Sequence, residues 1–194
     1  RLQGIAGSVP GLLKSKEFIL HTPDGRGLLV QGNGRQPTPS FGTTVELTGM
    51  MLIDDQGARI KMYARDAWQG VGFTEGVVGL RNVNLSAPSE EDAWSMVEVT
   101  GTIREVRRNV AWMDTEETSL GIVIRPPVKY RTERLRPGDI VHVRGVLDTR
   151  EEEARVYPRF AQEITLVQAA KVAAKISSMS TDPASTWTPF GAAG

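Results

Sequence analysis

The sequence predicts an all-β protein of two tandem five-stranded Greek-key barrels, followed by a short C-terminal helix and a tail. One observation is an internal repeat, because residues 5–31 align without a gap on residues 99–125, and residues 42–66 align on residues 138–162. The other is the pattern within each copy, where short β-branched runs alternate with glycine and proline turns. A repeat that keeps its apolar positions and glycines while its surface diverges indicates a duplicated fold.

The second copy, residues 95–168, shows the strands most clearly. Period-2 alternation and β-branched runs predict three strands in MVEVTGTI, NVAWMD and LGIVI. A polar, partly helix-compatible connector then ends in a Pro-Gly-Asp turn. Two further strands are predicted in IVHVRGVLD and ARVYPRFAQEI, so the order is strand, strand, strand, connector, strand, strand.

The first copy, residues 1–70, repeats this order more loosely. Its predicted second and third strands are EFILHT and GLLVQ, and its last two are TVELTGMMLI and ARIKMYARDA. The connector between these pairs is too rich in glycine and proline to be a helix.

The remaining segments are predicted to connect and to end the chain. Residues 71–94 lead from one copy to the other, with LSAPSEEDA as the linker. Residues 169–194 are alanine-rich with apolar spacing near 3.6, which indicates a short helix before a flexible tail. Whether Trp187 and Phe190 in that tail dock on a domain stays open.

The composition excludes several classes of protein. The net charge of zero does not exclude nucleic-acid binding but makes it less expected, because a dedicated nucleic-acid binder usually carries a basic excess. The absence of cysteine excludes disulfide scaffolds and thiolate chemistry. No apolar run approaches the roughly 18 residues of a membrane span, and the N-terminus lacks the order of a signal peptide. The chain begins without methionine, which suggests a piece of a longer protein.

Catalytic motifs are missing as well. His21 and His142 fall in different copies, and neither has a partner at metal-ligand spacing. The sequence contains neither GxxxxGK[ST] nor GxSxG. We therefore expect no enzymatic activity, no metal and no cofactor.

The predicted strand order, with a Gly-Asp turn that leads into V-x-V-x-G, describes an OB-fold. The strings VEVTGTIREV, RPGDIVHVRGVL and ARVYPRF resemble the tandem nucleic-acid-binding type of OB module that accompanies lamin-tail domains in bacterial surface proteins. The resemblance covers roughly residues 3–166. It implies nucleic-acid binding and an extracytoplasmic or envelope-associated location, while the residues themselves leave the compartment open.

An OB barrel binds oligonucleotides across strands 2 and 3, where aromatic side chains stack on bases above a cationic track. From residue 104 to 136 the second copy holds eight basic and five acidic residues. Its candidate binding residues are Arg104, Arg107, Arg108, Trp112, Arg125, Lys129, Tyr130 and Arg131. The thinner set of the first copy is Lys14, Lys16, Phe18 and Arg26, of which Phe18 is expected in the core.

A structural interpretation of the same residues competes with this one. Trp112 or its neighbour Met113 would then fill the barrel, because alternation alone does not say which points inward. The arginines would pair with carboxylates on a solvated surface, for which Glu105, Glu116 and Glu117 are candidates.

The function expected from the sequence is a non-enzymatic tandem module that binds nucleic acid, single-stranded and with little sequence preference. The alternative is a structural or protein-interaction scaffold of an assembly or envelope protein, which zero net charge and dense, balanced charge in the second copy favour. A third candidate is carbohydrate binding, since OB barrels also accept oligosaccharides on aromatic platforms.

Overall fold

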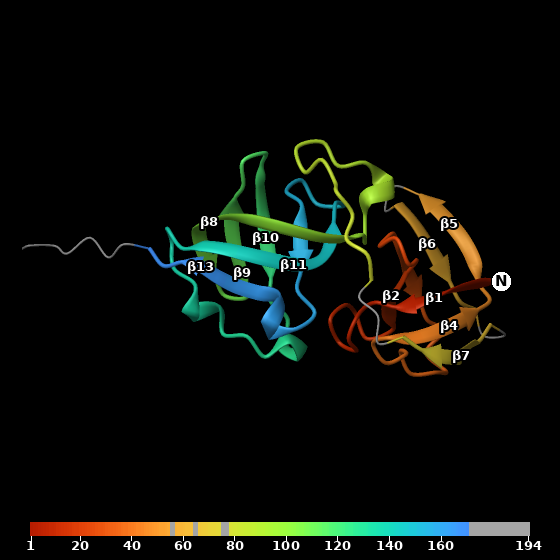
Figure 1. Ribbon diagram of the computed structural model, residues 1–194. Coiled ribbons are helices and arrows are strands. Elements are labelled where there is room, and N and C mark those ends of the chain that lie inside the picture. The colour runs from red at the N-terminus through yellow and green to blue at the C-terminus, as the bar shows by residue number, and fades with distance from the viewer. Residues whose placement is uncertain (55–56, 64–65, 75–77, 171–194) are drawn as a thin grey trace, which may run out of the picture.

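The structure of the chain is a computed structural model, which describes residues 1–54, 57–63, 66–74 and 78–170. The described residues are almost entirely β and form two separate sheets, one from each half of the chain (Figure 1). The predicted C-terminal helix, with Trp187 and Phe190, lies outside them. No helix among the described residues is long and apolar enough to cross a membrane.

The second half forms a closed five-stranded barrel with one additional strand. Pairing runs from β8 to β9, β10, β12 and β11 and returns to β8, and only β10 and β12 are parallel. This is the strand order of an OB barrel, which confirms the prediction for this half. The strands are β8 (Met96–Arg107), β9 (Val110–Asp114), β10 (Ser119–Val123), β11 (Ile140–Asp148), β12 (Arg155–Tyr157) and the added β13 (Ile164–Gln168).

Two details of this barrel differ from the prediction. ARVYPRFAQEI is not one strand, because Pro158 has no N–H for a ladder and Arg159 and Glu163 close a turn instead. This turn contains the 3-10 helix η4 (Ala161–Glu163), and the chain then returns as β13. The connector after β10 contains two 3-10 turns, η2 (Pro126–Val128) and η3 (Thr132–Arg134), rather than a helix.

The first half forms a seven-stranded sheet in the order β5-β6-β3-β2-β1-β4-β7. The predicted fourth strand is divided between β4 and β5, so that its two parts pair with β1 and with β6. Gly49 lies at the division, where a Cβ atom would come within 2.5 Å of the Ile60 side chain. The strands are β1 (Leu2–Ala6), β2 (Glu17–His21), β3 (Gly27–Gln31), β4 (Thr43–Leu47), β5 (Met50–Asp54), β6 (Gly57–Lys61) and β7 (Trp68–Phe73).

Strand β2 is buried on both faces, which shows how the two halves pack. Phe18 and Leu20 point into the core of the first half. Ile19 and, on β3, Leu29 point the other way and belong to the larger apolar cluster centred on the second barrel. The outer face of β2 and β3 is therefore covered by the other half of the chain.

Polar and aromatic contacts join the halves at the same interface. The N–H of Met96 donates to the carbonyl oxygen of Gly25 at 3.0 Å. On another part of the interface, the rings of Phe41 and Phe160 meet edge to face, with centroids 4.9 Å apart. The segment that contains η1 (Glu90–Asp92) leads into this interface, and Trp94, two residues after η1, is 2% exposed.

Candidate nucleic-acid interface

The outer face of β9 and β10 in the second barrel carries Trp112. Met113 points into the barrel and is fully buried, so Trp112 is the residue of the pair that faces outward. Its indole lies over Gly121 of β10, where a Cβ atom would come within 3.0 Å of Cζ3. Glu105 of β8 and Arg155 of β12 complete the same cross-strand row.

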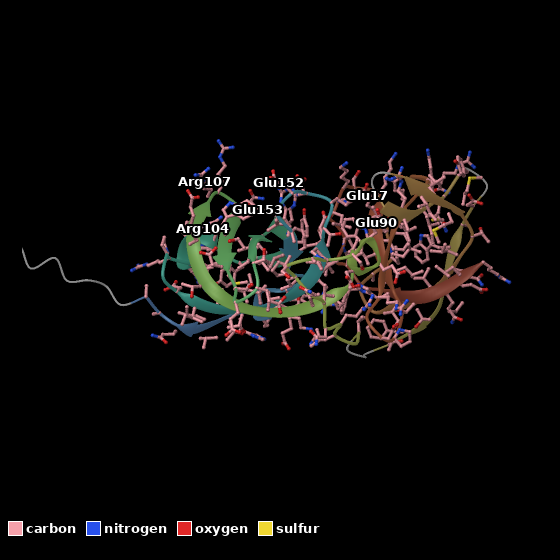
Figure 2. All side chains as sticks on the ribbon, turned by 90° about the horizontal axis from the view of Figure 1, so that it is seen from above. Glu17, Glu90, Arg104, Arg107, Glu152 and Glu153 are labelled. Atoms are coloured by element: carbon pink, nitrogen blue, oxygen red, sulfur yellow. The ribbon has the colours of Figure 1, made fainter. Side chains whose placement is uncertain are left out.

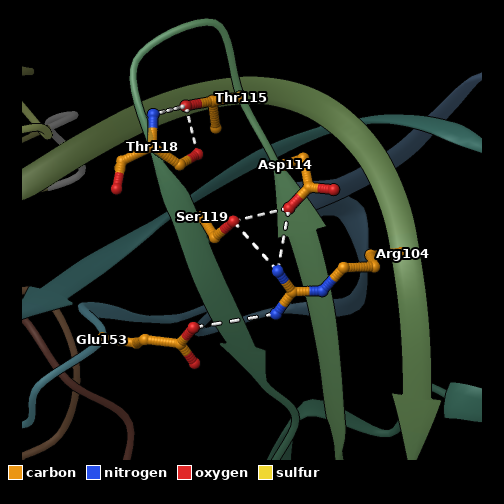
Figure 3. A network of polar contacts seen from close by, with 6 residues as sticks. All are labelled: Arg104, Asp114, Thr115, Thr118, Ser119 and Glu153. Atoms are coloured by element: carbon orange, nitrogen blue, oxygen red, sulfur yellow. Dashed lines mark hydrogen bonds and ion pairs between the residues drawn. The ribbon is translucent and has the colours of Figure 1, made fainter.

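The arginines next to Trp112 are paired with carboxylates. A β-bulge leaves Arg104 without a partner residue on β9, and both Arg104 and Glu105 point to the outer face. Nη1 of Arg104 lies 3.3 Å from Asp114 Oδ1, and Nη2 lies 3.7 Å from Glu153 Oε1 (Figure 3). Arg107 pairs with Glu105.

The polar network around Arg104 continues across the hairpin of β9 and β10. The Arg104 guanidinium also donates to Ser119 Oγ at 3.1 Å, and this hydroxyl donates to Asp114 at 2.6 Å. Thr115 and Thr118 close the turn above it (Figure 3). These contacts satisfy Arg104 within the protein, so a phosphate would have to compete with them.

The loop between β11 and β12 brings three consecutive glutamates to this face. Glu151, Glu152 and Glu153 line a cavity of about 390 Å³ together with Trp112 and Arg155. Glu151 pairs with Arg155 at 3.4 Å, and Glu153 pairs with Arg104. Figure 2 shows Glu152 and Glu153 on the same side of the barrel as Arg104 and Arg107.

A different surface gathers cations that the protein leaves unpaired. The segment that links β10 to β11, residues 125–136, is named here the basic connector; it holds five basic residues and one acidic residue, Glu133. All five cations are exposed, and none forms an ion pair with the residues that the structure describes. They are Arg125, Lys129, Arg131, Arg134 and Arg136.

The loops that carry two further predicted residues approach the basic connector. The N–H of Ile124 donates to the carbonyl oxygen of Asn109 at 2.8 Å, which brings the hairpin tip with Arg108 next to Arg125. The loop before β2, which carries Lys14, approaches the connector where Gly11 meets the Pro127 ring.

One aromatic ring accompanies these cations. Tyr130 is partly buried against the core, and this burial raises the pKa of its hydroxyl above the ordinary value of 10.0. Arg125 lies 5.9 Å from the centre of the Tyr157 ring, which orients its guanidinium without neutralising it.

The remaining residues predicted in the first half do not join this surface. Phe18 is 2% exposed in the core, as expected, and cannot stack on a base there. Lys16 leans over Gly34, and Arg26 pairs with Asp24 at 3.2 Å in the turn between β2 and β3. The outer face of β2 and β3, where an OB barrel would bind a ligand, is the face that Ile19 buries against the second half.

Sequence reasoning missed several residues that shape both surfaces. Arg134 and Arg136 continue the run of cations. The basic composition of this segment would have been enough to add them to the candidate binding residues. The approach of the three glutamates to Trp112 had no local signal, because it depends on how the β11–β12 loop folds back. Glu117, proposed as an arginine partner, instead accepts from the N–H of Leu85 at 2.8 Å.

The two histidines lie in different surroundings. His142 lies on the sheet surface between Thr100 and Glu98, and His21 is buried between the two halves. Over the described part of the chain, no group of three or more His, Asp or Glu side chains could hold a metal ion.

Comparison with known proteins identifies no family for this chain. No family model matches it, and no curated protein matches it. A solved structure of a murine DNA-binding protein bound to double-stranded DNA is 8% identical, with a TM-score of 0.36 over 79% of this chain and 86% of that one. The p204 HINb domain is 10% identical, with a TM-score of 0.35 over 80% and 91%. The function of this chain is therefore inferred from its own residues.

Proposed function

We propose that this chain is a non-enzymatic module of two OB-type units that binds nucleic acid through the basic connector. The observation that carries the proposal is the density of unpaired charge, with five exposed cations and one carboxylate in residues 125–136. Arg108 and Lys14 extend this surface from two neighbouring loops. Phosphate contacts made by such cations supply affinity by counterion release, whatever the net charge of the whole chain.

The paired arginines around Trp112 are not expected to supply this affinity. A phosphate that bound Arg104 or Arg107 would have to break an ion pair with Asp114, Glu153 or Glu105, and it would approach the glutamates of the β11–β12 loop. The negative charges of the phosphate and of these glutamates would repel each other and oppose binding. The proposal therefore moves the interface from the strand face expected of an OB barrel to the end of the barrel.

Single-stranded nucleic acid is the proposed ligand. The cations follow one extended segment of chain, and Tyr130 offers one partly exposed ring among them, which suits a flexible backbone with accessible bases. No side chain of the connector is part of a groove-inserting helix or ribbon of the kind that reads duplex DNA. Little sequence preference is expected, because stacking and phosphate contacts do not distinguish bases.

Fluorescence anisotropy across a salt series tests the proposal. A labelled strand of about 12 nucleotides lies within the ~4–16 that one OB barrel covers. We expect binding that weakens with salt, and weaker binding of the matching duplex. For single strands the logarithm of the binding constant changes by about −0.7 per phosphate contact for each tenfold change in salt. Replacing both Lys129 and Arg131 by glutamine should therefore reduce this slope by about 1.4.

The matched control replaces two paired arginines, Arg104 and Arg107, by glutamine. This variant removes the same amount of charge from the same barrel, so its slope should stay close to that of the original chain if the connector is the interface. Equal effects of the two double variants would contradict the assignment. Failure of the original chain to bind in a salt-sensitive way at about 100 µM, the weak end of non-specific affinity, would remove the proposal.

A scaffold function is the second candidate, and the packing of the two halves favours it. The outer face of β2 and β3 in the first half is buried by the second half, so the two halves pack as one continuous unit. Such a unit could serve as a spacer of a larger assembly, including the envelope proteins that the lamin-tail resemblance implies. Co-purification of a partner chain with this module, together with no nucleic-acid binding, would favour this function.

A further inference from the structure

The cavity over Trp112 is a second surface that the proposed function does not use. It has a volume of about 390 Å³, which falls in the range of about 300–1,000 Å³ that is typical of small-ligand sites. It lies over β9 and β12 and the β11–β12 loop, whereas the basic connector follows β10 at the end of the barrel. The two surfaces can therefore be altered separately.

The floor of this cavity is an aromatic ring that packs on Gly121. Gly121 gives the indole of Trp112 room to lie against β10, since a Cβ atom there would be 3.0 Å from Cζ3 and 3.3 Å from Cε3. A flat ring supported from below offers its other face to a ligand. Rings of this kind bind apolar C–H faces or other π systems, and they lose little conformational entropy when they do so.

The walls of the cavity present both hydrogen-bond donors and acceptors. Arg155 is held by Glu151, and Glu153 is held by Arg104. Each of these pairs leaves further guanidinium N–H groups and carboxylate lone pairs for a ligand. Glu152 is exposed and has no partner among the described residues, so it adds one more acceptor.

We propose that the cavity over Trp112 binds an uncharged saccharide, with a pyranose ring on the indole and its hydroxyls on the arginine–glutamate pairs. A sugar ring has an apolar C–H face for the platform and hydroxyls that both donate and accept at its edge. A polyanion is disfavoured by the three glutamates. A polycation is disfavoured because Glu151 and Glu153 already have cationic partners, and only Glu152 is free to pair.

Titration of the full chain with a panel of neutral trisaccharides tests this inference. Binding is measured by calorimetry and by tryptophan fluorescence. The panel consists of cellotriose, maltotriose, mannotriose and tri-N-acetylchitotriose. We expect at least one of them to bind saturably with a Kd of about 0.1–1 mM. Trp112→Ala should weaken binding at least tenfold. Since Trp112 lies on the surface of the barrel, a thermal unfolding curve should show that this variant still folds.

Two further variants separate the saccharide from other ligands. Gly121→Ala should weaken saccharide binding severalfold, because the new methyl group tilts the indole while the fold is kept. Glu152→Gln keeps an acceptor and removes the charge, so it should change saccharide binding less than threefold. A cation-binding site would instead lose most of its affinity in that variant.

Three results would overturn the inference. The first is that no trisaccharide binds saturably at concentrations up to about 10 mM. The second is that Trp112→Ala leaves saccharide binding unchanged. The third is that a tetralysine peptide binds and the sugars do not. The Lys129→Gln, Arg131→Gln variant serves as the control, because it should bind the saccharide normally. Loss of nucleic-acid binding and loss of saccharide binding are thus distinguishable, and either proposal can fail alone.

Discussion

The imidazole of His21 lies against the main chain of Trp94, with 2.8 Å between Nε2 and the carbonyl oxygen, at the interface of the two halves. Nε2 must carry the proton of this hydrogen bond, because a carbonyl oxygen only accepts. Nδ1 is buried and has no hydrogen-bond partner among the described residues. Burial lowers the pKa of His21 from 6.5 to about 4, the hydrogen bond to Trp94 opposes this, and the charge of Arg159 lowers it further.

This buried histidine predicts that the chain loses stability in mild acid. Between pH 6.5 and about 4 the unfolded chain binds a proton that the folded chain excludes, so the free energy of unfolding falls as the pH falls. The slope from this one group reaches about 1.4 kcal/mol per pH unit. Urea unfolding at several pH values should show this slope in the original chain. His21→Gln should lose it, and equal slopes in the two proteins would contradict the assignment.

Gly7→Ala is predicted to be strongly destabilising because Gly7 lies against the same ring. A Cβ atom at Gly7 would be 1.7 Å from Nδ1 of His21, so the imidazole or the strand must move. Overpacking of this kind costs about 1–3 kcal/mol or more. Gly72→Ala is the matched control, since its Cβ would meet only ordinary contacts at 3.8 Å, and it should stay within about 0.5 kcal/mol. Thermal unfolding of both variants gives the comparison.

The opposite orientations of Trp112 and Met113 predict different costs of truncation. Met113 is fully buried inside the barrel, so Met113→Ala should cost about 2–5 kcal/mol in the free energy of unfolding. Met113→Leu conserves volume and should cost less than about 1.5 kcal/mol. Trp112→Ala removes a larger but partly exposed side chain and should cost less than Met113→Ala. The reverse order in denaturant unfolding would mean that the indole fills the core.

The edge-to-face pair of Phe41 and Phe160 predicts energetic coupling between the two halves. Arg159 lies 5.0 Å from the centre of the Phe41 ring and strengthens the same contact. A double-mutant cycle with Phe41→Leu and Phe160→Leu should give a coupling energy of about 0.5–1.5 kcal/mol. If the two effects are additive, the halves do not depend on this contact.

Strands such as β8 were predictable because they bury alternate residues of their own short segment. Val99 and Ile103 of β8 are buried while Glu98 and Thr100 are exposed, which is the alternation present in the sequence. The division between β4 and β5 was not predictable, because it reflects the approach of Ile60 to Gly49 across the sheet.

The sequence shows which residues have side chains suited to binding nucleic acid. It does not show which of them share a surface after folding. The sequence placed Arg104, Arg107, Arg125 and Lys129 in one cluster. Folding separates them, because Asp114, Glu105 and Glu153 come close enough to neutralise the first two. The pair of Arg107 with Glu105 is local, since both residues lie on β8. No local pattern predicts the partners of Arg104, because Asp114 lies on β9 and Glu153 lies in a loop more than forty residues away.

The sequence by itself determined that the described chain is almost entirely β and which segments form most of its strands. Local alternation and turn residues decide these features, so they can be recognised one segment at a time. Only the tertiary structure decided which faces remain free. Ile19 and Leu29 have the same apolar character whether a ligand or the other half of the chain covers them. In the folded chain, contact between distant segments buries them against the other half. In the same way, an arginine is available to a phosphate only where folding brings no carboxylate to it.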